Sequence, residues 1–158
     1  MGQKITPCLW FDHNAGEAIA FYAGIFDDVQ ITQTDPYLDG NYGEAGSPMY
    51  YEFTMNGSEF SAINGGPEFK FNEAISLAID CKDQAEVDYF WEKLGDGGEH
   101  GPCGWLKDKY GLSWQVVPHR LYELIRDPDK AKAAAATQAM LQMGKLEIAE
   151  LEAAAANA

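Results

Sequence analysis

The chain has 158 residues and a mass of 17.4 kDa, and its 11 Lys and Arg against 25 Asp and Glu residues give a formal net charge of −14. Hydrophobic residues make up 46% of the sequence, which is enough for a buried core and argues against a disordered chain. Because so acidic a surface repels phosphate backbones and anionic lipids, we expect no nucleic acid and no membrane as partner.

Cysteine usage and the absence of long apolar runs bear on location. Cys8, Cys81 and Cys103 form an odd set without CxxC spacing, which fits neither a disulfide framework nor a zinc knuckle. The N-terminal residues do not follow the pattern of a signal peptide, and no apolar run approaches the roughly 18 residues of a membrane span. We therefore expect a cytoplasmic protein.

The first part of the chain is predicted to form a strand, a helix and three further strands. Asn14, with Glu17 three residues later, is typical of a helix N-terminus. Asn56-Gly57 stands between two β-like runs and is a strong hairpin signal. The predicted strands lie at 4–11, near 29–34, at 49–55 and at 59–63.

The same order of elements then starts again. Alternation over residues 74–81 predicts a strand, and a shift of 69 residues places Asn14 on Asp83, which begins a second predicted helix. A shift of 54 residues places 56–61 on 110–115. Because the caps recur in the same element order, we interpret the chain as two βαβββ modules. Short strands are expected around residues 100, 105–107 and 112–117.

The tail that follows differs in composition. Leu121–Ile125 is predicted to be helical, and Asp127-Pro128 is read as the cap and first turn of further helix within 129–156. Its larger apolar side chains need a surface to cover, either on this chain or on a second copy. They are Met140, Leu141, Met143, Leu146, Ile148 and Leu151.

Two stretches of sequence closely resemble a known family. NGGPEFKFNEAIS (64–76) and CGWLKDKYGLSWQVVP (103–118) are similar to the PhnB-like branch of the vicinal oxygen chelate (glyoxalase/bleomycin-resistance) superfamily. That branch often carries the label 3-demethylubiquinone-9 3-methyltransferase. The resemblance covers the chain from about Lys4 to Leu151. It implies an α+β fold in which two βαβββ modules form a half-open barrel around a cavity, and it implies a homodimer.

The resemblance and the element order together predict the domain organisation. We expect residues 1–118 to form a paired glyoxalase-like domain, with modules at about 4–64 and 73–118, and residues 119–158 to form a C-terminal helical extension. The glycine pattern does not support the methyltransferase label. An S-adenosylmethionine site needs a glycine-rich turn that opens a helix after a parallel strand, whereas the clusters at 40–46 and 95–101 are read as turns.

Metal-dependent relatives place their ligands on the first and last strands of each module. With Cys8 and Trp10 taken to face the first helix, Leu9 and Phe11 would face the cavity. Four residues then stand at the ligand positions: Pro7, Ser61, Ser76 and Gln115. Catalytic transition metals require imidazole, carboxylate or thiolate ligands, so we expect no metal and no other cofactor. His13, His100 and His119 are interpreted as surface residues.

The expected cavity has apolar walls and a few hydrogen-bonding groups, which suits a small organic ligand, although the same groups would equally serve buried backbone or water. The candidate ligand-binding residues are Ser61, Asn64, Ser76, Asp80, Cys103, Trp105 and Gln115. Two functions remain open at this point: a metal-free protein that binds a small molecule, and a metal-dependent enzyme of the glyoxalase or dioxygenase type. The sequence assigns no catalytic residue.

Overall fold

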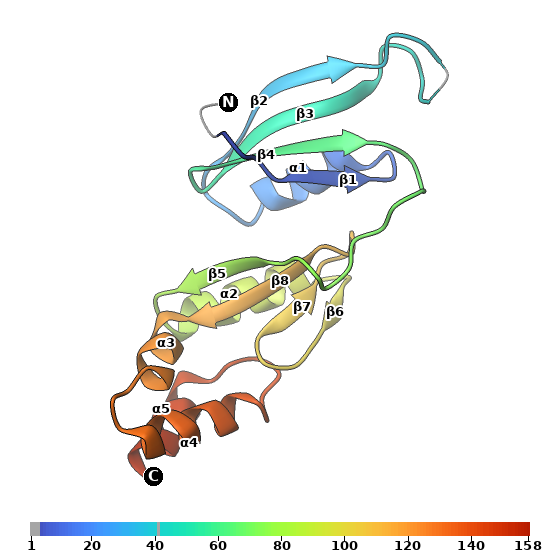
Figure 1. Ribbon diagram of the computed structural model, residues 1–158. Coiled ribbons are helices and arrows are strands. Elements are labelled where there is room, and N and C mark those ends of the chain that lie inside the picture. Colours follow the sequence, from blue (N-terminus) through green and yellow to red (C-terminus); the bar gives the residue numbers. More distant parts are fainter. Residues whose placement is uncertain (1–3, 41) are drawn as a thin grey trace. The chain divides into compact units, whose positions relative to one another are not determined.

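The structure, a computed structural model, describes residues 4–40 and 42–158, and the chain divides into two compact units, Met1–Phe71 and Asn72–Ala158. Each unit contains an open, mixed four-stranded sheet with an α-helix between its first and second strands (Figure 1). The prediction of two βαβββ modules in an α+β fold is confirmed. None of the helices in the described ranges combines the length and the apolar character needed to span a bilayer.

The first unit has the sheet order β1-β4-β3-β2. β1 runs parallel to β4, and the other neighbours are antiparallel. Asn56 and Gly57 both adopt positive φ values, 47° and 75°, as the tight turn of the predicted hairpin requires. The elements are β1 (Cys8–Phe11), α1 (Ala15–Ala23), β2 (Val29–Pro36), β3 (Pro48–Met55) and β4 (Ser58–Asn64).

The phase predicted for β1 is wrong by one residue. Leu9 and Phe11 are buried and lie in register with Ala62 and Asn64, on the face whose side chains form the core with α1. Cys8, which we expected to face the helix, lies on the opposite face and is exposed. The reason is that Cys8 to Phe11 are all apolar, so alternation offers no polar face to set the phase.

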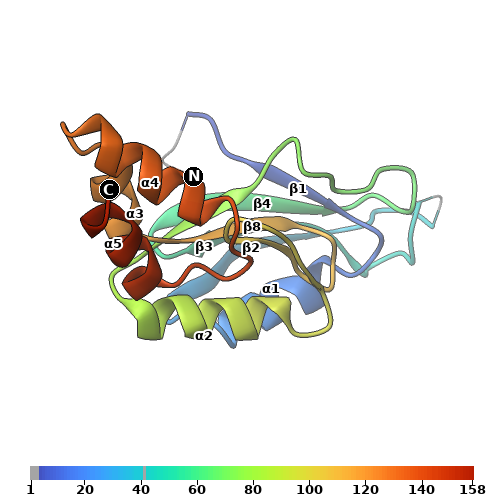
Figure 2. The ribbon, with the colours of Figure 1, turned by 90° about the horizontal axis from the view of Figure 1, so that it is seen from below.

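The second unit repeats the topology, with the sheet order β5-β8-β7-β6 and a parallel pairing of β5 with β8. Leu77, Ile79 and Cys81 face α2, which covers one side of this sheet (Figure 2). The strand phase predicted here is the one observed. The elements are β5 (Leu77–Cys81), α2 (Gln84–Gly95), β6 (Glu99–His100), β7 (Trp105–Lys107) and β8 (Ser113–Pro118).

The two module helices are capped differently. At α2, Asp83 Oδ1 accepts a hydrogen bond from the Glu86 backbone N–H at 2.9 Å, as predicted. At α1, the side chain of Asn14 makes no capping hydrogen bond, although Asn14 stands at the N-cap position. Instead, Oδ1 of Asn64 on β4 accepts from the Ala15 N–H at 2.9 Å. Asn64, which is 49 positions from Ala15 in the chain, thus accepts the capping hydrogen bond that the local pattern assigned to Asn14.

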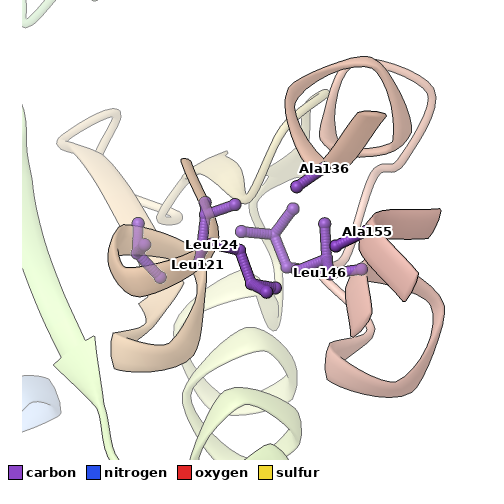
Figure 3. Packing of buried hydrophobic residues seen from close by; sticks show 7 residues of the cluster. Leu121, Leu124, Ala136, Leu146 and Ala155 are labelled. Atoms are coloured by element: carbon purple, nitrogen blue, oxygen red, sulfur yellow. The ribbon is translucent and has the colours of Figure 1, made fainter. Parts of the chain in front are cut away.

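The tail folds onto the second unit, where Leu146 and Leu151 are buried and Met140 and Met143 pack against them, whereas Leu141 is 49% exposed. Its helices are α3 (His119–Ile125), α4 (Lys130–Met140) and α5 (Ile148–Ala156), and α4 is capped by Asp129 rather than by Asp127. Figure 3 shows side chains from all three helices and from Leu146, which precedes α5, directed toward one another. The buried cluster contains Val117, Leu121, Leu124, Ala136, Leu146, Leu151 and Ala155.

Candidate functional site

The face of the second sheet opposite α2 carries two neighbouring rows of side chains, and one of them is polar. Strand register brings Ala78, Gln115 and Trp105 side by side across β5, β8 and β7. The next row pairs Ser113 with Lys107 and Lys107 with Glu99. Because residues in register on neighbouring strands point to the same side of a sheet, Ser113, Lys107 and Glu99 form one group on this face.

A hollow of about 460 Å³ lies over the second of these rows. Its floor and walls come from β6, β7, the first residue of β8 and the loop between β6 and β7. The lining residues are Glu73, Glu99, His100, Gly101, Pro102, Cys103, Trp105, Leu106, Lys107 and Ser113. We call it the Ser113 hollow. Its volume lies within the range of about 300–1,000 Å³ that is usual for small-molecule sites.

Ser113 is the lining residue whose buried hydroxyl makes no hydrogen bond with the described residues. The side chain is buried, with 1% of the residue exposed, and among the described residues its Oγ has no hydrogen-bond partner. A buried hydroxyl without a partner costs about 1–3 kcal/mol, and such groups are rare in folded proteins. The hydroxyl therefore has a hydrogen-bonding capacity that no described residue uses.

Lys107 brings a positive charge beside Ser113. Its Nζ forms an ion pair with Glu73 Oε1, and Glu99 Oε2 lies 4.0 Å away. The hydrogen bond with Glu73 raises the pKa of Lys107, and the same hydrogen bond lowers the pKa of Glu73. Lys107 therefore stays charged at neutral pH, and so does Glu73.

The loop that forms one wall of the Ser113 hollow is held by the C-terminal tail. The backbone N–H groups of Cys103 and Gly104 donate to the carbonyl oxygens of Met143 and Gly144, each at 2.7 Å. The Gly104 carbonyl in turn accepts from Val116 N–H at 2.8 Å. Cys103 has a φ of 57°, an unusual value for a residue with a side chain, and these hydrogen bonds hold its backbone there.

Four of the predicted ligand-binding residues come together on this face. Cys103 and Trp105 line the Ser113 hollow. Gln115 is in register with Trp105, and its Nε2 donates to Ser76 Oγ at 2.9 Å. The contact of Ser76, which directly precedes β5, with Gln115 on β8 follows from the strand phase predicted for this module.

Ser61 and Asn64 belong to the first unit and have different surroundings. Ser61 is buried on β4, in register with Cys8 on one side and Glu52 on the other. The side chain of Asn64 is committed within the protein, because its Nδ2 donates to the Pro48 carbonyl at 2.9 Å while its Oδ1 caps α1. Asn64 lies at the edge of a second hollow of about 380 Å³, with Trp10 among the other lining residues.

Asp80 lies on the same sheet face as Gln115 but lines a different hollow. It is exposed, and its Oδ2 lies 3.0 Å from Nδ1 of His119, the first residue of α3. Sequence reasoning correctly placed His119 at the surface but missed this pair, because the two residues are 39 positions apart. The hollow, of about 400 Å³, is also lined by Tyr122, Glu123 and Arg126.

The positions of the His, Cys, Asp and Glu side chains show whether the described residues could bind a metal ion. Within residues 4–40 and 42–158, no three His, Cys, Asp or Glu side chains gather where they could hold one ion. The corrected phase of β1 brings Cys8, not Pro7, to the open face, but its register partner Ser61 adds no strong ligand. The described side chains therefore do not fit a catalytic transition-metal site, which requires about three imidazole, carboxylate or thiolate ligands.

Comparison with known proteins identifies the family. Residues 3–117 match the family model described as 3-demethylubiquinone-9 3-methyltransferase. A PhnB protein from Bacillus cereus that carries the same methyltransferase name is 35% identical, with a TM-score of 0.65, over 73% of this chain and 99% of that one. The chain is a PhnB-like member of the vicinal oxygen chelate superfamily. No curated protein matches it.

More distant structures share the fold of this PhnB-like protein. Protein PA1353 from Pseudomonas aeruginosa is 18% identical with a TM-score of 0.58, over 72% of this chain and 95% of its own. The fosfomycin resistance protein FosX from Listeria monocytogenes, solved with Mn(II) and sulfate, is also 18% identical, with a TM-score of 0.50 over 72% of this chain and 89% of its own. The resemblance inferred from the two sequence motifs is confirmed.

Proposed function

We propose that this PhnB-like protein binds a small organic molecule in the Ser113 hollow and needs no resident metal to do so. The observation that carries the proposal is the buried, unpartnered hydroxyl of Ser113 in a hollow of ligand size. Trp105 supplies an aromatic lining, and Cys103 adds a thiol from the loop between β6 and β7. We propose that Gln115 and Ser76 extend the binding surface along the sheet.

The inherited methyltransferase name does not alter this proposal. In the first unit, glycines 40–46 belong to the connection between β2 and β3. In the second, the glycines from 95 to 98 join the end of α2 to β6, and Gly101 follows β6. Since neither cluster opens a helix after a parallel strand, they do not offer backbone N–H groups in the manner of a class I S-adenosylmethionine site.

We also propose that the protein is a cytoplasmic homodimer. All three cysteines are free thiols, as is usual in a reducing compartment. The homodimer rests on the resemblance to the superfamily. Light scattering from the purified protein tests it, because a species of 17.4 kDa at all concentrations would contradict a dimer.

The binding proposal is tested with the protein as purified and with a neutral aromatic probe, 2-naphthamide. Native mass spectrometry reports any molecule retained from the cell, and elemental analysis reports metal. Saturation-transfer NMR measures binding of the probe. Alkylation of Cys103 by iodoacetamide, in a Cys8→Ser background, reports whether the probe occupies the Ser113 hollow, because Cys103 lines it and Cys81 is fully buried.

We expect 2-naphthamide to slow alkylation of Cys103. Ser113→Ala should weaken this protection about threefold to tenfold, the usual worth of one neutral hydrogen bond. Ser58→Ala is the matched control, because Ser58 is an exposed serine of the first unit. If the probe does not bind, or binds without protecting Cys103, the proposed binding site is refuted. A near-stoichiometric transition metal in the purified protein would refute the proposal that no resident metal is needed.

A further inference from the structure

The Ser113 hollow offers two hydrogen-bond donors side by side. Ser113 and Lys107 are register partners on the antiparallel strands β8 and β7, so their side chains leave the same face of the sheet as neighbours. The Ser113 hydroxyl can donate one hydrogen bond, and the Lys107 ammonium up to three. Two donors on neighbouring residues, one of them charged, are suited to an oxygen that carries negative charge.

The structure already places a carboxylate against one of these donors. Glu73, which precedes β5, pairs with Lys107 at the edge of the hollow. Its side chain is 60% exposed, so the pair contributes little to stability and can open at little cost. The Glu73 carboxylate thus stands where the anionic group of a bound molecule would stand, while the deeper donor, Ser113, remains without a partner.

From this arrangement, and resting on the proposed function, we infer that the hollow recognises the carboxylate of an apolar or aromatic carboxylic acid. The carboxylate displaces Glu73 from Lys107 and accepts a hydrogen bond from Ser113. The apolar body of the molecule packs against Trp105 and the adjoining wall at Pro102. Glu73 is then a competitor that occupies Lys107 when no ligand is bound.

The charges around the hollow also argue against the opposite class of ligand. An amine placed beside Ser113 would sit next to the Lys107 ammonium, whose charge repels it. The two carboxylates that would attract an amine, Glu73 and Glu99, are 60% and 80% exposed and are therefore well screened by water. The Lys107 side chain, which is 36% exposed, is less exposed than either carboxylate, so we give its charge more weight in setting the charge of the ligand.

The test compares three probes of one shape and different charge: 2-naphthoate, 2-naphthamide and 2-naphthylmethylamine. Binding of each is measured by saturation-transfer NMR and by protection of Cys103 from iodoacetamide in the Cys8→Ser background. We expect 2-naphthoate to bind about tenfold more tightly than 2-naphthamide, the usual worth of a charge-assisted hydrogen bond over a neutral one. The amine should bind most weakly.

Three variants then assign the preference to named side chains. Lys107→Met should remove the preference for 2-naphthoate, because it weakens the binding of 2-naphthoate more than that of 2-naphthamide. Lys132→Met, which makes the same change of charge at an exposed position of α4, should alter the binding of neither probe. Glu73→Gln should tighten 2-naphthoate binding severalfold and change 2-naphthamide binding less, because the neutral side-chain amide of Gln competes less well than a carboxylate for Lys107. Glu73 is exposed, so this variant is informative even if a Lys107 variant folds poorly.

The outcomes separate this inference from the proposal on which it rests. If 2-naphthamide protects Cys103 but 2-naphthoate binds no better, or if the amine binds best, the carboxylate inference is overturned and the hollow remains a binding site. If none of the three probes protects Cys103, the proposed function fails, and the inference fails with it. An unchanged 2-naphthoate affinity in Glu73→Gln would overturn the role given to Glu73.

Discussion

The loop that walls the Ser113 hollow can be tested through Gly104. A Cβ atom on Gly104 would lie 2.7 Å from the Val116 carbonyl oxygen and 3.0 Å from Leu146 Cδ1, and the residue has a φ of +81°. The positive φ costs a residue with a side chain about 1–2 kcal/mol. The clash with backbone adds about 1–3 kcal/mol, because the loop or β8 must move. Gly104→Ala should therefore lower the free energy of unfolding by about 2–5 kcal/mol.

Gly111 provides the matched control for this prediction. Its φ is +88°, close to that of Gly104, but a Cβ built there meets no atom of the described chain within 4 Å. Gly111→Ala should therefore cost only the backbone contribution, about 1–2 kcal/mol. Urea unfolding followed by tryptophan fluorescence measures both variants. The alkylation rate of Cys103 in the folded protein shows whether the hollow has changed shape in Gly104→Ala.

The comparison of the two variants tests whether the loop at Gly104 is tightly packed. A larger loss in Gly104→Ala than in Gly111→Ala, with a changed rate of Cys103 alkylation, is the expected result. Equal losses of stability in the two variants would refute the claim that the loop is packed tightly between Val116 and the tail. An unchanged alkylation rate in Gly104→Ala would show that the wall of the hollow does not depend on this contact.

Other predictions follow from burial and capping. Leu146→Ala, at a residue with no exposed surface, should cost about 2–5 kcal/mol of unfolding free energy in urea titrations, and a loss below 1 kcal/mol would contradict its place in the tail core. Asn64→Ala should cost about 1–3 kcal/mol in the same assay, whereas Asn14→Ala should be nearly neutral, and a larger loss of unfolding free energy in Asn14→Ala than in Asn64→Ala would show that Asn14 caps α1. Burial raises the pKa of the Cys81 thiol from 9.0 to about 12, so the unfolded chain loses this proton first and stability should fall between about pH 9 and pH 12, by at most ~1.4 kcal/mol per pH unit. A Cys81→Ala variant with the same pH slope would contradict that assignment.

Much of the local structure was predictable because its signals lie within a few residues of one another. The hairpin at Asn56-Gly57 and the cap at Asp83 are examples, and both are confirmed. The duplicated order of elements and the motifs at 64–76 and 103–118 were enough to predict the fold and the family, which the matches to the family model and to the Bacillus cereus protein confirm.

Within the 103–118 motif, Asp108 shows why a family motif need not mark ligand contacts. Its Oδ1 accepts from the backbone N–H groups of Tyr110 and Leu112, and its Oδ2 accepts from Trp114 Nε1 at 2.9 Å. This buried carboxylate therefore fixes the turn between β7 and β8 and anchors a core tryptophan. Residues of this motif therefore stabilise the fold as well as line the hollow.

The amino-acid sequence by itself determined the alternation of elements, the duplication and the polar face of β5, since each depends on side chains close together along the chain. Only the tertiary structure decided which face of the apolar β1 is buried, that Asn64 rather than Asn14 caps α1, and that the register partners Ser113 and Lys107 line one hollow. It also decided that the tail holds the wall at Cys103. These features depend on strand register and on packing between residues tens of positions apart, which spacing along the chain does not encode.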